Sequence, residues 1–221
     1  MLQNNIFRWR TGRGLIVLAG GGDPNSEDNL SITANLLSHT LSQGPIAYIW
    51  AASNIEQADL HMDLLRDLGA RTGYLVDILT EEDDALARQL NEAGVIILGE
   101  GPSGERLQEA LVGVALQAIE DAYRRGATLY AIGPIAGALG TYAVRGADLV
   151  DGFNWLAGSI ILPGYSPDDA ERLRAWVHQH PDSYGLGLGA GAALMLGPNG
   201  ELDVWGNGAI TISLGQHYHA G

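Results

Sequence analysis

The chain has 221 residues, of which 46% are hydrophobic and 17% are charged, and its 26 acidic and 12 basic side chains give a formal net charge of −14. This length suits one globular domain with a full hydrophobic core, whereas the negative charge disfavours binding to the phosphate backbone of nucleic acids. Because the chain has no cysteine, it excludes disulfides, thiolate metal sites and cysteine nucleophiles.

No apolar stretch approaches the roughly 18 residues that a membrane-spanning helix requires, and residues 1–13 lack the apolar segment of a secretory signal. We therefore expect a cytoplasmic protein that does not bind membranes. No repeat, linker or low-complexity tract divides the sequence. Residues 1–221 are accordingly predicted to form a single domain.

Short apolar segments alternate with amphipathic ones along most of the chain. Strands are predicted at residues 14–19, 45–50, 72–76, 95–98, 128–132 and 159–162. Helices are predicted at residues 28–42, 56–68, 80–93, 104–124 and 167–179. A capping box formed by Thr80 and Asp83 is expected to open the third helix.

This alternation of strands and helices is typical of right-handed βαβ units. It predicts an α/β fold of three layers, with a doubly wound, mainly parallel sheet of the flavodoxin-like type. Near the C-terminus, short turns replace the helices, and this change predicts partly antiparallel strands. Those strands are expected at residues 186–188, 192–196, 203–205 and 209–214.

Ligands of open parallel sheets bind beyond the carboxyl ends of the strands, and two loops there carry polar side chains. Three glycines precede Asp23, so this loop either presents backbone N–H groups to an anion or forms a tight structural turn. In the loop after residues 95–98, Ser103 either caps the following helix or acts as a nucleophile, with Glu105 as the nearest candidate base.

The loop after residues 128–132 has the sequence Gly133-Pro134-Ile135-Ala136-Gly137-Ala138. A tight strand-to-helix turn flanked by small residues is how a nucleophile elbow lifts one side chain above a sheet. We expect Ile135 at the tip of this turn, where it cannot serve as a nucleophile. The alternative is a plain turn in which glycine permits close packing.

With this turn in register, residues 14–214 resemble the cyanophycinase and dipeptidase E family of serine peptidases, which has the class I glutamine-amidotransferase-like fold. The family's elbow reads Gly-x-Ser-Ala-Gly-Ala, and residues 133–138 follow it except at Ile135. Further segments occur in the family's order: the glycines before Asp23, residues 158–163, the helix with Arg172 and Leu173, residues 180–182, residues 185–188 and residues 205–208. The tail, residues 215–221, lies outside the resemblance.

The differences from the family fall on its catalytic positions. Ile135 stands at the serine, Gly164 and Tyr165 stand where the family has its histidine and an aromatic residue, and Gly189 and Ala190 replace an acidic pair. The oxyanion turn reads Gly99-Glu100-Gly101. Because acyl transfer needs a nucleophile, a base and oxyanion donors together, the resemblance implies a protein that has lost peptidase chemistry.

We therefore expect a catalytically degenerate homologue that binds a small molecule or peptide or serves in assembly, with no cofactor. The expected pocket is formed by Asp23, Gly99, Glu100, Gly101, Ser103 and Tyr165. The alternatives are an active hydrolase of small peptides that uses Ser103, and a structural subunit of an active paralogue. The family resemblance also suggests a homodimer.

Histidine and acidic clusters elsewhere have simpler explanations than metal binding. His217 and His219 have a spacing that could chelate a metal, but histidines of a terminal tail are more often exposed to solvent. Residues 81–84 are all acidic, as suits the first turn of a helix. No metal site is predicted.

Overall fold

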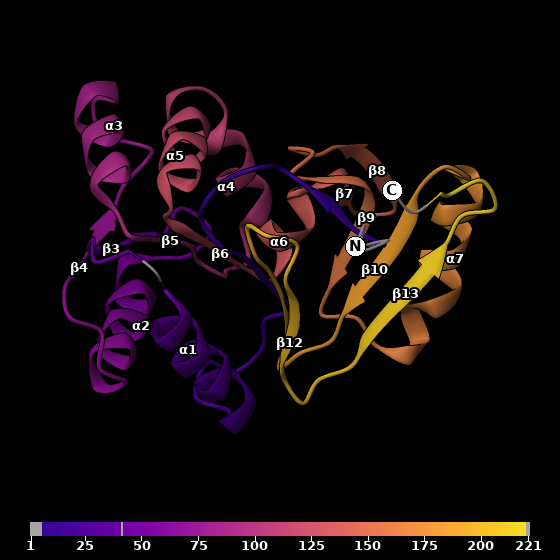
Figure 1. Cartoon of the computed structure of the whole chain (residues 1–221), viewed down its shortest axis with the longest axis horizontal. Coiled ribbons are helices and arrows are strands. Elements are labelled where there is room, and N and C mark those ends of the chain that lie inside the picture. Colours follow the sequence, from indigo (N-terminus) through magenta and orange to yellow (C-terminus); the bar gives the residue numbers. More distant parts are fainter. Residues whose placement is uncertain (1–5, 41, 220–221) are drawn as a thin grey trace.

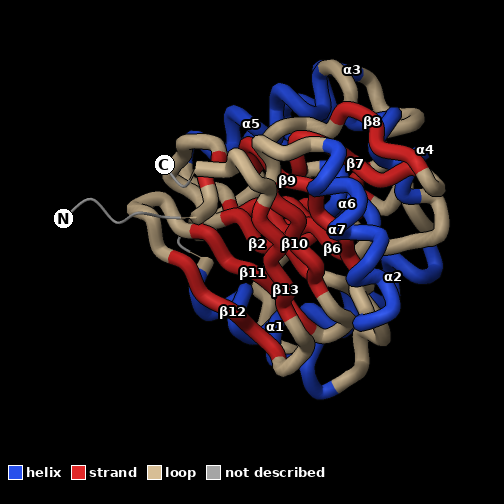
Figure 2. Tube along the Cα trace, turned by 90° about the vertical axis from the view of Figure 1, so that its right-hand side faces the viewer, coloured by secondary structure: helices blue, strands red, loops and turns tan. Residues whose placement is uncertain are grey.

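The structure, a computed structural model, describes residues 6–40 and 42–219. Its strands form two sheets, and helices pack on the faces of both (Figures 1 and 2). Parts of three predictions fall outside the described residues: the absent signal within residues 1–13, the end of the helix at residues 28–42, and the last residues of the tail at 215–221.

The first sheet has seven strands and follows the predicted alternation. Its order is β12 (Leu202–Gly206), β11 (Ala192–Leu196), β2 (Ile16–Ala19), β6 (Thr128–Ile132), β5 (Val95–Leu98), β3 (Ile46–Ile49) and β4 (Gly73–Val76). The five strands from β2 to β4 are parallel, and β11 and β12 continue the sheet in antiparallel pairing. The predicted α/β fold with a mainly parallel sheet is confirmed.

The central strands of this sheet are apolar on both faces, and helices cover both. On one face lie α1 (Glu27–His39) and α2 (Ile55–Asp67), and on the other lie α3 (Asp83–Glu92), α4 (Gly104–Leu111) and α5 (Val114–Arg125) (Figure 1). Alternate residues of one strand therefore belong to different cores. In β2, for example, Ile16 packs with the α3–α5 side and Val17 with the α1–α2 side.

A second sheet, of six strands, is formed by the later part of the chain and was not predicted as a separate sheet. Its order is β13 (Ile210–Leu214), β10 (Tyr184–Leu188), β9 (Leu156–Pro163), β7 (Gly140–Arg145) and β8 (Asp148–Asp151), with β1 (Arg8–Trp9) also paired to β9. The 3-10 turn η1 (Pro167–Asp169) leads into α7 (Ala170–Gln179), which packs on its outer face. The inner face of this second sheet packs in the same core as α3, α4, α5 and the first sheet.

The chain passes repeatedly between the two sheets. It goes from β1 to β2, from β6 through the short helix α6 (Pro134–Ala138) to β7, from β10 back to β11, and from β12 to β13. Leu194 of β11 and Leu186 of β10 consequently lie in one continuous hydrophobic core. No single cut in the described chain would separate the two sheets.

Two local predictions are wrong. The helix expected at residues 104–124 is broken between α4 and α5, where Gly113 has a φ of 107° that ordinary residues rarely adopt. The expected capping box does not form, because Glu82 is the N-cap of α3 and makes no side-chain cap. The Thr80 hydroxyl instead donates to the Asp77 carboxylate at 2.7 Å.

Among the helices that the structure describes, none combines the length and the apolar character needed to cross a bilayer.

Candidate functional site

The loops that follow β2, β5 and β6 meet at one edge of the first sheet, because these parallel strands are direct neighbours there. Their carboxyl ends border a pocket of about 450 Å³. Its floor is the sheet, its walls are α1 and α2, and its rim is the loops after β2 and β5. The lining residues are Gly22, Pro24, Asn25, Asn29, Thr33, Tyr48, Gln57, Leu60, His61, Leu64, Glu100, Gly101, Pro102, Tyr130 and Ile132.

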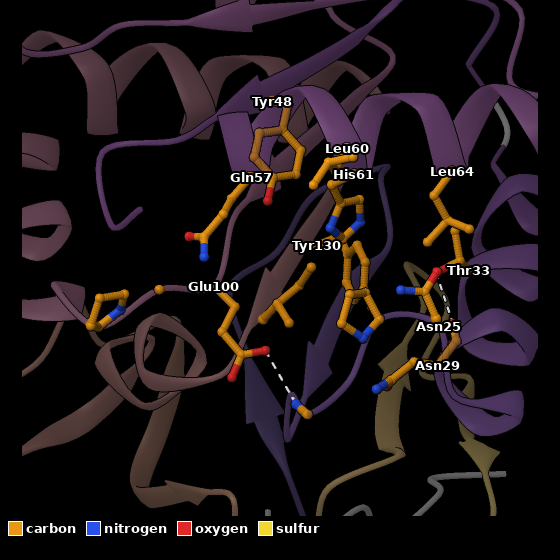
Figure 3. Close-up of a pocket in the computed structure, with 15 residues that line it drawn as sticks. Asn25, Asn29, Thr33, Tyr48, Gln57, Leu60, His61, Leu64, Glu100 and Tyr130 are labelled. Atoms are coloured by element: carbon orange, nitrogen blue, oxygen red, sulfur yellow. Dashed lines mark hydrogen bonds between the residues drawn. The ribbon is translucent and has the colours of Figure 1, made fainter. Parts of the chain in front are cut away.

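Glu100 is the acidic residue of the pocket, and its carboxylate lies against three glycines. The Gly22 backbone N–H donates to its Oε2 at 3.2 Å (Figure 3). A Cβ added to Gly21 would lie 2.4 Å from Oε1, and one added to Gly133 would lie 2.8 Å from the same oxygen. All three glycines have positive φ values. Glycine is therefore required at Gly21 and Gly133 both by backbone conformation and by the space that the carboxylate fills.

The glycine loop before Asp23 has features of both structures expected for it. It is a tight structural turn, and one of its N–H groups binds an anion, which is the carboxylate of Glu100 from the same chain. Burial raises the pKa of Glu100, and the hydrogen bond from Gly22 opposes this by lowering it.

The turn after β6 differs from the expected elbow. Its left-handed residue is Gly133, with φ 66° and ψ −138°, and α6 begins at the next residue, Pro134. The expectation that Ile135 stands at the tip is wrong. Ile135 lies inside α6, is 1% exposed and packs in the main core with Ala136. The strand ends at Ile132 as expected, but the turn lies at Gly133, two residues before Ile135, because glycine can adopt this conformation without a side chain to accommodate.

Two tyrosines form the floor of the pocket. Burial raises the pKa of both Tyr48 and Tyr130, and the negative charge of Glu100 contributes to both increases. Their hydroxyls are therefore protonated at neutral pH and can donate hydrogen bonds. Gly99 permits this arrangement, since a Cβ there would lie 2.4 Å from the Tyr48 hydroxyl.

His61 on α2 stacks against Tyr48, with ring centroids 5.1 Å apart at an angle of 47°. Its Nε2 is buried and has no hydrogen-bond partner among the described residues. Burial lowers its pKa to about 4, so the ring is neutral at physiological pH. Figure 3 places His61 and the two tyrosines between Glu100 on one side and Thr33 of α1 on the other.

Of the residues expected to form the pocket, Glu100 and Gly101 line it. Asp23 lies nearby on an exposed turn, where its carboxylate accepts from the Asn25 N–H at 2.9 Å. Gly101 lies so close to the loop after β3 that a Cβ would be 2.2 Å from the Ala52 carbonyl oxygen.

The other four expected residues, Asp23, Gly99, Ser103 and Tyr165, are not among those that line the pocket. Ser103 occupies the N-cap position of α4, but its side chain makes no capping hydrogen bond. Glu105, its candidate base, lies 3.8 Å from the Arg145 guanidinium. Tyr165 lies in the loop after β9, where its ring fills the space beside Gly187 and packs with the cluster under α7.

The other histidine and acidic candidates also lie elsewhere. His217 and His219 are exposed, and the His217 N–H donates to the Pro181 carbonyl at 3.0 Å. Glu81 precedes α3, where its carboxylate accepts from the Asp77 N–H. Within the described residues, no group of three or more histidine, aspartate or glutamate side chains is arranged to hold a metal ion.

The sequence reasoning missed the pocket residues of both helices. Gln57, Leu60, His61 and Leu64 of α2 are spaced three and four residues apart and share one face. In α1, Asn29 and Thr33 are buried polar residues four apart on the otherwise apolar inner face. A pair of polar residues on an otherwise apolar helix face is the sequence pattern that could have indicated this pocket.

No protein-family model and no curated protein matches the chain. Several solved structures share its fold, among them two proteins described as peptidases. A peptidase from an acI-B1 Actinobacterium has a TM-score of 0.70 and 17% identity, over 93% of each chain. The chain therefore shares its fold with a protein described as a peptidase. A protein from Listeria monocytogenes EGD-e, proposed to be a peptidase E, has a TM-score of 0.58 and 15% identity, over 88% of this chain and 98% of its own. The predicted resemblance to peptidase E-type proteins is thus confirmed for the fold.

Proposed function

We propose that this protein is a catalytically inactive relative of the cyanophycinase and dipeptidase E peptidases that binds a small molecule or short peptide in the pocket of Glu100. One observation carries this proposal: the carboxylate of Glu100 occupies the space above Gly133, the residue at the tip of the elbow-like turn. A nucleophilic side chain at that tip and the observed position of Glu100 exclude each other.

The charge of Glu100 also opposes acyl transfer. Peptide cleavage by a serine peptidase builds negative charge on an oxyanion, which backbone N–H groups must stabilise. Here the Gly22 N–H already donates to a carboxylate, and two negative charges at close range repel each other. His61 of α2, the histidine that lines the pocket, is neutral, and its ring lies against Tyr48 of β3.

Hydrolysis assays test the proposal. The purified chain is incubated with aspartyl dipeptides and with aspartate–arginine polymer, and released products are measured against buffer and against the variant Glu100→Gln. We expect no release above buffer for either protein. Turnover by the wild-type chain that is lost in Glu100→Gln would overturn the proposal, because it would make the carboxylate a catalytic group.

The second candidate function is hydrolysis through Ser103, and it is supported by the absence of a capping hydrogen bond on this hydroxyl. A fluorophosphonate probe should label the folded chain if Ser103 is an activated nucleophile, and Ser103→Ala should abolish the labelling. We expect no labelling, because the nearby Glu105 is exposed and close to Arg145.

A homodimer is our proposal for the assembly state. The edge strands β12 and β13 expose four large apolar side chains, and monomeric proteins usually expose such residues singly. They are Leu202, Val204, Ile212 and Leu214. Light scattering should give the mass of two chains; the mass of one chain would refute the dimer, and co-purification with a second, similar chain would favour a subunit of an active paralogue.

A further inference from the structure

The charge on the pocket lining is negative. Glu100 contributes a carboxylate, no lysine or arginine is among the lining residues that the structure describes, and His61 is neutral near pH 7. The formal net charge of −14 adds a field of the same sign. An anionic ligand would therefore be repelled from this pocket, and a cationic ligand would be attracted.

The carboxylate of Glu100 has unused capacity to accept hydrogen bonds. Its one hydrogen bond among the described residues comes from the Gly22 N–H, and none of the ion pairs of the described chain involves it. An ionised carboxylate can accept about four hydrogen bonds. A half-buried carboxylate without a basic partner gains most from a ligand that brings both a positive charge and N–H donors.

The rest of the lining suits an apolar body. Leu64 and Ile132 are among the lining residues, the rings of Tyr48 and Tyr130 lie between Leu64 and Glu100 (Figure 3), and Leu60 is 70% exposed at the mouth. A volume of about 450 Å³ is far larger than an ammonium ion needs, and pockets of this size hold small organic molecules. Tyrosine rings also attract cations.

We propose that the pocket binds a small organic cation, in which an ammonium group with N–H donors contacts Glu100 and an apolar body lies against the tyrosines and leucines. This inference rests on the proposed function, because it names the ligand class of the same pocket. Either a free amine or the N-terminal ammonium group of a peptide carries this chemistry.

Isothermal titration calorimetry with matched probes tests the inference. The full chain is titrated at pH 7 with 2-phenylethylamine, 2-phenylethanol and 3-phenylpropionate, which share a phenyl body and differ in charge. We expect the amine to bind at least about tenfold more tightly than the alcohol, as a charge-assisted hydrogen bond predicts, and the carboxylate to bind weakest. Phenylalaninamide has an ammonium group that resembles a peptide N-terminus. Comparing its affinity with that of 2-phenylethylamine distinguishes a peptide ligand from a free amine.

Three variants test whether the preference for the amine over the alcohol arises in this pocket. Glu100→Gln should reduce the amine's advantage over the alcohol to about twofold or less, since a neutral acceptor remains without the charge. The matched control Glu105→Gln removes one exposed carboxylate outside the pocket and should keep the advantage. Leu60→Lys adds a positive charge at the exposed mouth and should weaken amine binding without disturbing the core.

Several outcomes would overturn the inference. These are equal binding of amine and alcohol, tighter binding of the carboxylate, an unchanged preference in Glu100→Gln, or no binding of the amine at millimolar concentration. Binding of the alcohol or the carboxylate alone would leave a small-molecule pocket and so would spare the proposed function. Hydrolysis of the peptide substrates, measured separately, would overturn the proposed function whatever the probes do.

Discussion

Replacement of Gly133 by alanine tests whether the Glu100 carboxylate truly occupies the tip of the turn. The backbone of Gly133, at φ 66° and ψ −138°, lies in a region that is almost restricted to glycine, and a side chain there costs about 1–3 kcal/mol. The new Cβ would also lie 2.8 Å from Glu100 Oε1 and 3.0 Å from Cδ and Cγ, well inside the favourable contact distance of about 3.5–4.0 Å.

Glu100 must then move, and it would give up its hydrogen bond from Gly22. A hydrogen bond to a charged group contributes about 1.5–3 kcal/mol. We therefore expect Gly133→Ala to lower the free energy of unfolding by about 3–5 kcal/mol in the wild-type background. When Glu100 is already alanine, only the backbone cost of about 1–3 kcal/mol should remain.

Urea denaturation of the wild type, the two single variants and the double variant measures this coupling. Gly146→Ala is the control, because Gly146 has a similar φ of 62° and a Cβ there would meet nothing within 4 Å. It should show the backbone cost alone, independent of residue 100. If the costs of Gly133→Ala and Glu100→Ala add within about 0.5 kcal/mol, the carboxylate does not fill this space and the reasoning fails.

Three further predictions concern the same region. Burial raises the pKa of Glu100 above its unfolded value of 4.5, so its contribution to stability is full below that pH and is lost as the pH rises through the folded pKa. Calorimetry should therefore give Glu100→Gln a higher Tm than the wild type at pH 7, and a similar Tm near pH 4; a lower Tm at pH 7 would contradict this. The pKa of His61 is lowered from 6.5 to about 4, so its contribution is present above pH 6.5 and is lost as the pH falls toward 4. His61→Phe should keep the contact with Tyr48 and remove up to about 3 kcal/mol of this acid sensitivity, and an unchanged pH slope in urea unfolding would argue against it. Ile135→Ser should lower the free energy of unfolding by about 3–5 kcal/mol, since it opens a cavity and buries a hydroxyl, without any hydrolysis of aspartyl dipeptides; a gain of turnover would show that the serine had reached a working site.

Much of the first sheet could be predicted because its strands are buried on both faces. The ranges expected at residues 95–98, 128–132 and 192–196 coincide with β5, β6 and β11. An uninterrupted apolar run leaves few other structures open to such a segment.

The second sheet could not be predicted in the same way. Strands β7 and β8 carry mixed, partly exposed residues, and β1 has only two residues, so no periodic pattern marks them. The sequence does not mark the break at Gly113, because the apolar periodicity continues on both sides, in α4 and α5.

Pocket residues that directly follow a strand could be predicted from the sequence, whereas those brought to the pocket by tertiary packing could not. Glu100 and Gly101 come directly after a buried strand, and the pocket is there. The family's order predicts Tyr165 in the pocket, yet its ring packs against the second sheet, in the cluster under α7. His61 and Tyr48 look like ordinary members of amphipathic or apolar segments. The pairing of β3 with β5 places Tyr48 near Glu100, and the packing of α2 on the sheet brings His61 against Tyr48.

The repeated passage of the chain between the sheets has a consequence during synthesis. Strand β2 pairs with β6 on one side and with β11 on the other, so residues 16–19 keep an open edge until residues 192–196 have left the ribosome. At ordinary rates of translation this takes on the order of 10–40 s. An apolar strand with an unpaired edge invites association with other chains. The nascent protein therefore has a window for aggregation or for chaperone binding that closes only when its last strands arrive.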